Sequence, residues 1–388
     1  MSQKTILLLG ASGSIGSQTL DIINKNPQDF ILKGISIGKK TRKINAILHH
    51  FPSIEAICIQ DKSRLAYYQK HYPDICFYSG DEGLVKLIDK VKPEMVVNAL
   101  VGFVGLYPSI YALENNYKLA LANKEALVVG GELINKLLSQ GKGELYPIDS
   151  EHSALWKCLK VDDENVDKLV ITASGGAFRK YNRDQLVDVK ASDALKHPTW
   201  KMGAKITIDC ATMVNKSFEV IEAYYLFGYD YEHIDILLHD ESMIHSMVKY
   251  QSGLYRGELS HPDMRNPIKF ALYEGNIPFQ TVTADDYHNF GPYHFHQFSL
   301  DRYPVVINAK RVIDNKGGYG AVFNASNEVA VRAYLNDEIP FLQIEEIINY
   351  CMNHYKNEKI HGYQDLLRID LKTRELAKKL IRKELSFK

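Results

Sequence analysis

The chain has 388 residues, of which 45% are hydrophobic and 24% are charged. A chain of this length predicts two or three globular domains rather than one core. The 47 basic and 47 acidic residues cancel, so the net charge gives no reason to expect nucleic acid or an acidic membrane surface as the main partner. Five scattered cysteines without a CxxC pair argue against a zinc ribbon or a disulfide framework and fit a reducing compartment.

The apolar segments indicate a cytoplasmic protein. Four apolar residues before Gly10 are too few for the core of a signal peptide. The longest mostly apolar stretch, residues 95–107, is interrupted by Asn98, Gly102 and Gly105 and is therefore not expected to span a bilayer.

The first 148 residues alternate short apolar runs with longer helical patterns. Runs at 6–9, 31–37, 56–59 and 95–98 suit buried parallel strands, and stretches such as 15–25 and 44–50 suit crossover helices. This alternation predicts a Rossmann-like, doubly wound α/β domain over residues 1–148.

The pattern changes at residue 149. β-rich runs at 168–173, 205–209, 233–238 and 243–250 are separated by long polar connections, which predicts a central α+β domain over 149–273. Residues of about 174–204 have little regular pattern, as is typical of either a disordered loop or an active-site lid. A linker rich in His, Tyr and Pro follows at 274–301. Helical spacing of apolar residues near 344–352 and 376–381 predicts a C-terminal helical domain over 302–388.

A glycine-rich loop follows the first predicted strand and opens the first predicted helix. Gly10, Gly13 and Gly16 lie in the run Gly-Ala-Ser-Gly-Ser-Ile-Gly. Glycines there allow a tight turn and a close approach to a pyrophosphate at the helix N-terminus. The alternative is an ordinary turn between a strand and a helix.

A basic turn follows the second predicted strand. NAD-preferring sites usually carry an acidic residue here, but this chain has Gly38-Lys39-Lys40-Thr41-Arg42. Three cations would attract a 2′-phosphate, so the turn favours NADP over NAD. The alternative is a solvated basic turn.

Two acids stand at the junction of the first two predicted domains. Asp149 and Glu151 are two residues apart, so in an extended segment their side chains share a face. Paired carboxylates suit a hard cation such as Mg²⁺ or Mn²⁺, although such pairs are also common on solvated edges. We expect His152 to be a supporting hydrogen-bonding residue rather than a ligand.

A second polar group is expected where the predicted strand at 205–209 leads into a helix. Asn215 and Glu219 are four residues apart and share one helical face, with Lys216 beside them. A lysine, an amide and nearby hydroxyls at a helix start are suited to binding phosphate. The alternative is a helical turn with a capping role.

Together, these motifs resemble those of the 1-deoxy-D-xylulose 5-phosphate reductoisomerase family, in family order over roughly residues 5–330. The matching strings are Gly10-Ala-Ser-Gly-Ser-Ile-Gly16, Asn123-Lys124-Glu125, Asp149-Ser-Glu151-His, Ser174-Gly-Gly-Ala-Phe-Arg179, His197-Pro-Thr-Trp200-Lys-Met-Gly203, Asn215-Lys216 to Glu219, Ile244-His-Ser-Met247, Pro262-Asp-Met-Arg265 and Asn324-Ala-Ser-Asn327-Glu328.

The resemblance implies a homodimer with an NADPH domain, a central catalytic and dimerising domain and a C-terminal helical bundle. It implies isomerisation of 1-deoxy-D-xylulose 5-phosphate and hydride transfer to give 2-C-methyl-D-erythritol 4-phosphate, in non-mevalonate isoprenoid biosynthesis. The implied cofactors are NADPH and Mg²⁺ or Mn²⁺, with the preferred metal left open. The rearrangement is left open between an α-ketol shift and a retro-aldol/aldol path.

The resemblance also assigns site residues by motif. Asp149, Glu151 and Glu219 are implied as metal ligands and, with Lys124, as catalytic residues. The implied substrate-binding residues are Lys124, Ser150, Glu151, Ser174, His197, Cys210, Asn215, Lys216 and Glu219. The implied cofactor-binding residues are Ser12, Gly13, Ser14, Ile15, Gly38, Lys39, Lys40, Asn123, Glu125 and Gly203.

The chain departs from the family pattern at three positions. Cys210 stands where serine is expected at a phosphate contact, and a thiol is the weaker donor, which puts this contact in doubt. Ala177 and Ser217 replace an expected proline and glycine. Two other functions remain as alternatives, namely a plain NADP-dependent dehydrogenase, which would not need the three acids, and a nucleotide sensor that has lost activity.

Overall fold

The computed structural model describes residues 3–162, 164–200, 202–276 and 291–383. The chain divides into two compact units. The first comprises residues 1–126, 133–149 and 264–277, and the second comprises 127–132, 150–263 and 278–388.

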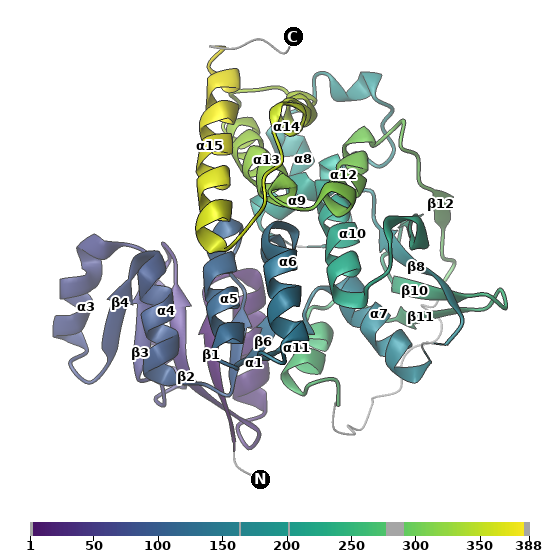
Figure 1. Ribbon diagram of the computed structural model, residues 1–388. Helices are drawn as coiled ribbons and strands as arrows, with labels where there is room; N and C mark the ends of the chain where they lie inside the picture. Colours follow the sequence, from purple (N-terminus) through teal and green to yellow (C-terminus); the bar gives the residue numbers. More distant parts are fainter. Residues whose placement is uncertain (1–2, 163, 201, 277–290, 384–388) are drawn as a thin grey trace. The chain divides into compact units, whose positions relative to one another are not determined.

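The first unit is built on a parallel sheet of seven strands in the order β4-β3-β2-β1-β5-β6-β7 (Figure 1). The strands are β1 (Lys4–Leu9), β2 (Phe30–Ile37), β3 (Ala56–Ile59), β4 (Cys76–Ser79), β5 (Met95–Asn98), β6 (Lys118–Leu121) and β7 (Glu144–Pro147). The central strands are buried on both faces, which explains why they read as continuous apolar runs. The strand order reverses between β1 and β5, which confirms the predicted doubly wound fold.

Helices connect these strands in the first unit. They are α1 (Ser14–Lys25), α2 (Ile44–His50), α3 (Leu65–His71), α4 (Gly80–Val91), α5 (Leu106–Glu114) and α6 (Lys124–Ser139), with the 3₁₀ helices η1 (Thr41–Lys43), η2 (Lys62–Arg64) and η3 (Phe103–Gly105). Residues 127–132 of α6 group with the second unit.

A later segment, with α11 (Arg265–Leu272), returns to the first unit. Glu274, just after this helix, accepts from the ammonium groups of Lys4 at 2.5 Å and Lys118 at 2.7 Å. The ring of Tyr273 packs edge-on against Phe30 with the ring centroids 4.9 Å apart. These contacts tie α11 to β1, β2 and β6.

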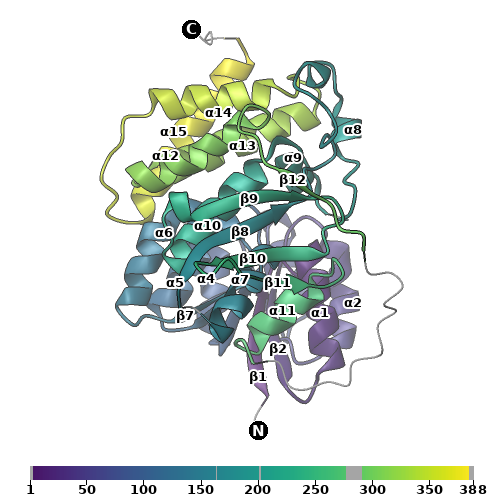
Figure 2. The ribbon, with the colours of Figure 1, turned by 90° about the vertical axis from the view of Figure 1, so that its right-hand side faces the viewer.

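The second unit contains a five-stranded sheet in the order β11-β10-β8-β9-β12 (Figure 2). Its strands are β8 (Val166–Ala173), β9 (Ile234–His239), β10 (Ile244–Tyr250), β11 (Tyr255–Leu259) and β12 (Phe295–Gln297). Only β8 and β9 pair in parallel among the described strands of this sheet. Helix α7 (Ser150–Val161) packs on β10 and β11, and α10 (Val214–Phe227) packs on β8 and β9.

The remaining helices of the second unit include a C-terminal group in which α13 packs against α14 and α15. They are α8 (Ala191–Ala194), α9 (Ala204–Thr212), α12 (Ile307–Asn315), α13 (Tyr319–Leu335), α14 (Gln343–His354) and α15 (Tyr363–Ile381), with η4 (Asp184–Leu186), η5 (Tyr231–His233) and η7 (Pro304–Val306). The predicted apolar stripes are buried, as at Ile344, Ile348 and Leu380.

One predicted element is wrong. Residues 205–209 were expected to form a strand, because Lys-Ile-Thr-Ile-Asp alternates polar and β-branched residues. They lie instead in α9, where Lys205 pairs with Asp209 one turn later at 2.8 Å and the Thr207 hydroxyl donates to the carbonyl of Gly203. These i to i+4 contacts exist only in a helix, so packing and local pairing override the β propensity.

The functional division of the chain at residues 148, 273 and 301 stays a prediction. Much of the predicted linker, residues 277–290, lies outside the described residues. Among the residues that are described, none of the helices combines the length and the apolar content that crossing a membrane requires.

Packing within the second unit gives a stability prediction at Gly320. A Cβ at this position would lie 1.9 Å from the carbonyl oxygen of Val128, whereas a Cβ at Gly362 would meet nothing within 4 Å. Gly320→Ala gains about 1 kcal/mol in helix propensity, but the clash with backbone costs roughly 1–3 kcal/mol or more. We expect Gly320→Ala to lower the melting temperature in calorimetry and Gly362→Ala to leave it nearly unchanged. Equal melting temperatures for the two variants would contradict this packing.

Candidate active site

The glycine-rich loop lies at the carboxyl end of β1. Gly10 has φ of +89°, and a Cβ there would lie 2.5 Å from the carbonyl oxygen of Ala99. A Cβ at Gly16 would lie 2.3 Å from the carbonyl oxygen of Gly10. Both positions therefore require glycine. Gly13 is the N-cap of α1, so Ser12, Gly13, Ser14 and Ile15 lie where the first helix presents its free N–H groups.

The basic turn lies at the carboxyl end of the neighbouring strand β2. Lys39 and Lys40 are exposed, and Thr41 is buried at the start of η1. Lys43 donates to the carbonyl oxygen of Ser12 at 3.2 Å. The structure thus brings the predicted residues Gly38, Lys39 and Lys40 next to the glycine-rich loop, and Lys43 connects the two segments.

Asn123 organises the carboxyl ends of β5 and β6. It caps α6 by accepting from the backbone N–H of Ala126. Its amide nitrogen donates to the carbonyl oxygens of Leu100 and Gly102 and to the carboxylate of Glu125, at 2.9–3.1 Å. Asn123 and Glu125 are buried, so this edge of the first unit is held by satisfied polar contacts.

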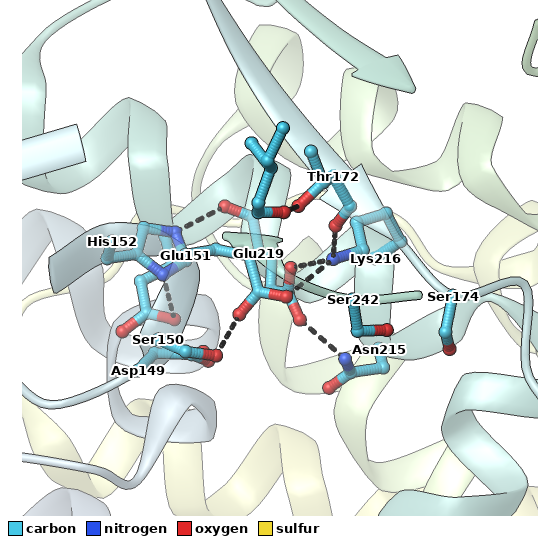
Figure 3. Close-up of polar contacts among 12 residues, drawn as sticks. Asp149, Ser150, Glu151, His152, Thr172, Ser174, Asn215, Lys216, Glu219 and Ser242 are labelled. Carbon is cyan, nitrogen blue, oxygen red and sulfur yellow. Dashed lines mark hydrogen bonds and ion pairs between the residues drawn. The ribbon is translucent and has the colours of Figure 1, made fainter. Parts of the chain in front are cut away.

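Three carboxylates gather where β7 ends and α7 begins. Asp149, Glu151 and Glu219 each offer an oxygen, and these oxygens lie within 4.8 Å of one another (Figure 3). Asp149 closes a segment of the first unit but is joined to Ser150 by a peptide bond, so the polypeptide itself carries its carboxylate to the start of α7. Such a set of hard oxygen donors fits Mg²⁺ or Mn²⁺.

Lysines compensate these acids. The ammonium group of Lys124 lies 2.5 Å from the carboxylate of Asp149. Lys216 donates to the carboxylates of Glu219 and Glu151 and to the carbonyl oxygen of Thr172. Glu219 is 1% exposed and Lys216 is 4% exposed. Burying an uncompensated charge costs several kcal/mol, and these contacts offset that cost.

Asn215 and Ser150 complete this polar set. The amide of Asn215 donates to Glu219 at 2.5 Å, which confirms that the two side chains share one helical face. The hydroxyl of Ser150 donates to Glu151 at 2.5 Å. Lys216 thus contacts the acids here, and its predicted role in holding phosphate stays a prediction.

A histidine and a further acid lie behind the carboxylates. The Nε2 atom of the buried His152 lies 2.9 Å from the carbonyl oxygen of Glu219, and its Nδ1 atom lies 3.4 Å from Glu222. His152 thus connects α7 to α10 by a hydrogen bond. Because Asp149, His152 and Glu222 also offer ligand atoms within 4.8 Å of one another, its role as a supporting residue rather than a ligand stays a prediction. Sequence reasoning missed Glu222, whose position one helical turn after Glu219 was the available signal.

Ser174 and His197 form a second polar group in the second unit. The backbone N–H groups of Thr199 and Trp200 donate to Nδ1 of His197, so the proton of the neutral ring lies on Nε2 and points to the Ser174 hydroxyl, 3.1 Å away. Ser174 also accepts from the N–H of Gly176. With both contacts accepted, the hydroxyl proton of Ser174 remains available for a further acceptor among the contacts of the described residues.

Cys210 lies near the end of α9, before a sharp turn into α10. Met213 joins the two helices with φ of 68°. A Cβ at Gly176 would lie 2.6 Å from the carbonyl oxygen of Cys210, so the loop that carries Ser174 packs directly against this part of α9. Asp209, beside Cys210, accepts from the amide of Asn327 on α13 at 2.9 Å.

The structure therefore brings Ser150, Glu151, Asn215, Lys216 and Glu219 together, and a separate contact joins Ser174 to His197. Gly203, the N-cap of α9, lies in the second unit, apart in sequence from the other predicted cofactor residues. The backbone carbonyl of Thr172 and the hydroxyl of Ser242, which bonds to Thr199 at 3.3 Å, had no motif that marked them.

The burial of His197 gives a prediction about its charge. Burial, together with the nearby positive charge of Arg179, lowers the pKa of His197 to about 4. The ring therefore stays neutral between about pH 5 and pH 8, and its protonation opposes folding as pH falls from its unfolded value near 6.5. A histidine NMR titration should give a midpoint near 4, and a midpoint near 6.5 would contradict the described environment.

Models of known families match most of the chain. The family described as 1-deoxy-D-xylulose 5-phosphate reductoisomerase matches residues 6–131. The family described as 1-deoxy-D-xylulose 5-phosphate reductoisomerase C-terminal domain matches 145–227, and that described as DXP reductoisomerase C-terminal domain matches 259–376.

Relatives resemble the chain over its whole length. A 1-deoxy-D-xylulose 5-phosphate reductoisomerase of Geobacillus kaustophilus (strain HTA426) is 42% identical over 381 residues, covering 97% of this chain and 100% of the relative. One of Bacillus cereus (strain AH187) is 41% identical over 376 residues, covering 96% and 99%.

Solved structures of the same family share the fold of this chain. A DOX-P reductoisomerase in complex with NADPH, fosmidomycin and magnesium has a TM-score of 0.91 at 30% identity, with 98% of both chains covered. The 1-deoxy-D-xylulose 5-phosphate reductoisomerase from Zymomonas mobilis in complex with NADPH has a TM-score of 0.89 at 31% identity, with 98% of this chain and 99% of that chain covered.

Proposed function

The chain belongs to the 1-deoxy-D-xylulose 5-phosphate reductoisomerase family, and from this premise we propose how it acts. It isomerises 1-deoxy-D-xylulose 5-phosphate and reduces the product to 2-C-methyl-D-erythritol 4-phosphate, using NADPH and a divalent metal ion. The reaction serves non-mevalonate isoprenoid biosynthesis. The observation that carries the proposal is the approach of Asp149, Glu151 and Glu219 to within 4.8 Å, in a chain that also carries a dinucleotide-binding fold.

The residues present fit both cofactors. Three carboxylates are the donor set that Mg²⁺ or Mn²⁺ prefers, and the glycine-rich loop at the start of α1 suits a pyrophosphate. When bound, the metal supplies Lewis-acid stabilisation of the negative charge on substrate oxygens, and NADPH supplies the hydride.

The side chains around the acids position the substrate. Lys124, held against Asp149, places a cation beside the substrate oxygens, where negative charge develops as the carbon–carbon bond shifts. Ser150 and Glu151 bind the substrate hydroxyls. Glu219 accepts from both Asn215 and Lys216 at the start of α10 and so orients these two side chains next to the phosphate.

The phosphate is held by neutral donors as well as by Lys216. Ser174 donates its hydroxyl proton, while His197 and the N–H of Gly176 fix its oxygen. Cys210 supplies a thiol where a hydroxyl is expected, and the weaker donor costs no more than about 1 kcal/mol. Asn123, Glu125 and Gly203, with the two cofactor loops, bind NADPH.

The segment 174–204 acts as a lid that keeps water from the reactive aldehyde. Its first part is anchored. Phe178 packs on Phe341 with the ring centroids 5.2 Å apart, Arg183 pairs with Glu345 at 2.8 Å, and the Tyr334 hydroxyl donates to the carbonyl of Val189. We therefore assign the motion to the part of the lid that follows this anchored segment, where His197 and Trp200 lie.

The enzyme works as a cytoplasmic homodimer. The five cysteines are free in the structure, as a reducing compartment requires. The family resemblance supports the dimer, and the central domain is the expected dimerising part.

Removing one metal ligand tests the proposed metal site. Glu219→Gln keeps the size of the side chain but replaces a negatively charged metal ligand with a neutral amide. We expect kcat/KM to fall by roughly 100-fold or more, and the affinity for Mn²⁺ to fall as well. Glu232→Gln is the matched control, because Glu232 pairs with Lys310 on the surface of the same unit. NADPH oxidation with 1-deoxy-D-xylulose 5-phosphate and Mn²⁺ binding measured by electron paramagnetic resonance provide the readouts. The proposal fails if Glu219→Gln turns over like the control, or if a chelator leaves wild-type turnover intact.

The fluorescence of Trp200 tests the lid. The chain has two tryptophans, so Trp156→Phe leaves Trp200 as the sole reporter. Adding the phosphosugar substrate with Mg²⁺ but no NADPH prevents turnover and should shift the emission, because closure changes the water around the indole ring. An emission spectrum that ignores the substrate, in a variant that still turns over with NADPH, would remove the lid assignment.

A further inference from the structure

We propose that Arg64 is a specificity residue for the cofactor, and that it recognises the 2′-phosphate of NADPH together with Lys39 and Lys40. This inference rests on the proposed use of NADPH and deepens it. Arg64 belongs to no motif of the sequence analysis and lies 22 residues beyond Arg42, the last cation of the basic turn.

Strand pairing places Arg64 beside the basic turn. Strands β2 and β3 are parallel neighbours, with Ile37 opposite Ile59 at their carboxyl ends. The segments that follow them, residues 38–43 and 60–64, therefore leave the same edge of the sheet side by side. Residue Gln60 reflects this, because its side-chain oxygen lies 3.7 Å from where a Cβ of Gly38 would be.

A direct contact fixes the guanidinium group. Nη1 of Arg64 donates to the hydroxyl of Thr41 at 3.0 Å. Thr41 is 3% exposed and stands directly after Lys40, whereas the side chain of Arg64 is 58% exposed. One donor of the guanidinium is thus held by a buried residue that directly follows Lys40 in the chain, and the rest of the group is exposed to solvent.

The nearest acid, Asp61, pairs with Arg64 through Nε only. Asp61 lies 3.7 Å from Nε of Arg64, a loose contact. Its Oδ1 atom instead accepts from the N–H and the hydroxyl of Ser63 at 3.0 and 2.6 Å. These hydrogen bonds from Ser63 lower the pKa of Asp61. The planar guanidinium can still offer paired N–H groups to a phosphate.

Two other lysines near the basic turn are directed away from the proposed phosphate site. Lys43 is committed to the carbonyl oxygen of Ser12 and supports the pyrophosphate loop. Lys62 lies in η2 with Arg64, but its Cε atom lies 3.0 Å from where a Cβ of Gly80 would be, so this side chain extends toward β4 and α4. Lys62 is therefore a matched control with the same charge on the same turn.

The test compares ligands with and without the 2′-phosphate. Variants Arg64→Ala, Arg64→Gln and Lys62→Ala are measured for kcat/KM with NADPH and NADH, and for binding of 2′,5′-ADP and 5′-AMP by titration calorimetry. Loss of one charge-assisted phosphate contact predicts about a tenfold fall for NADPH and 2′,5′-ADP, with NADH and 5′-AMP unchanged. Lys62→Ala should behave as wild type. Arg64→Gln, which keeps a donor for Thr41, should lose as much as Arg64→Ala.

Three results would overturn the proposal. An equal loss for NADH or 5′-AMP means that Arg64 only supports the turn. Full NADPH affinity in Arg64→Gln means that the hydrogen bond to Thr41, not the charge, matters. An equal loss in Lys62→Ala means a general field effect. A wild-type enzyme that does not prefer NADPH over NADH would instead refute the cofactor preference itself, which separates the two failures.

Discussion

The structure depends on holding three carboxylates close enough to share one cation. Like charges at this distance repel, and Glu219 is almost fully buried, so the arrangement needs compensation from its surroundings. Lys216 contributes to it by binding Glu219, Glu151 and the carbonyl of Thr172. Two helices and a strand are therefore fixed by the same ammonium group. The acids therefore also stabilise the fold, because the contacts that neutralise them join α7, α10 and β8.

The contact between Ser174 and His197 is built without charge. His197 is neutral because it is buried and because Nδ1 is occupied by two backbone donors. A neutral ring can donate a hydrogen bond to Ser174 without adding a positive charge at this position. The charged groups are thus the acids and lysines, whereas backbone N–H groups and hydroxyls orient His197 and Ser174.

Much of the first unit could be predicted from the sequence, since parallel strands buried on both faces leave continuous apolar runs. The predicted runs at 56–59 and 95–98 coincide with β3 and β5. The acids could be found because Asp149 and Glu151 lie close in sequence and Glu219 lies in a recognisable motif. The predicted strand at 205–209 failed because β-branched residues dominate its local pattern, and only Lys205, Asp209 and the packing of α9 reverse it. Glu222, Thr172 and Ser242 could not be singled out, because a backbone carbonyl or a lone polar residue gains its role only from neighbours distant in the chain.

The bond between Asp209 and Asn327 joins residues 118 positions apart. On a ribosome, α9 emerges long before α13, so the buried carboxylate of Asp209, which pairs with Lys205 within α9, forms its bond to the Asn327 amide only later. The end of α9 next to Cys210 can reach its final form only after the C-terminal helices have been synthesised. A nascent chain that stalled before α13 would leave the end of α9 without this hydrogen bond, so this part of the second unit is completed only late in synthesis.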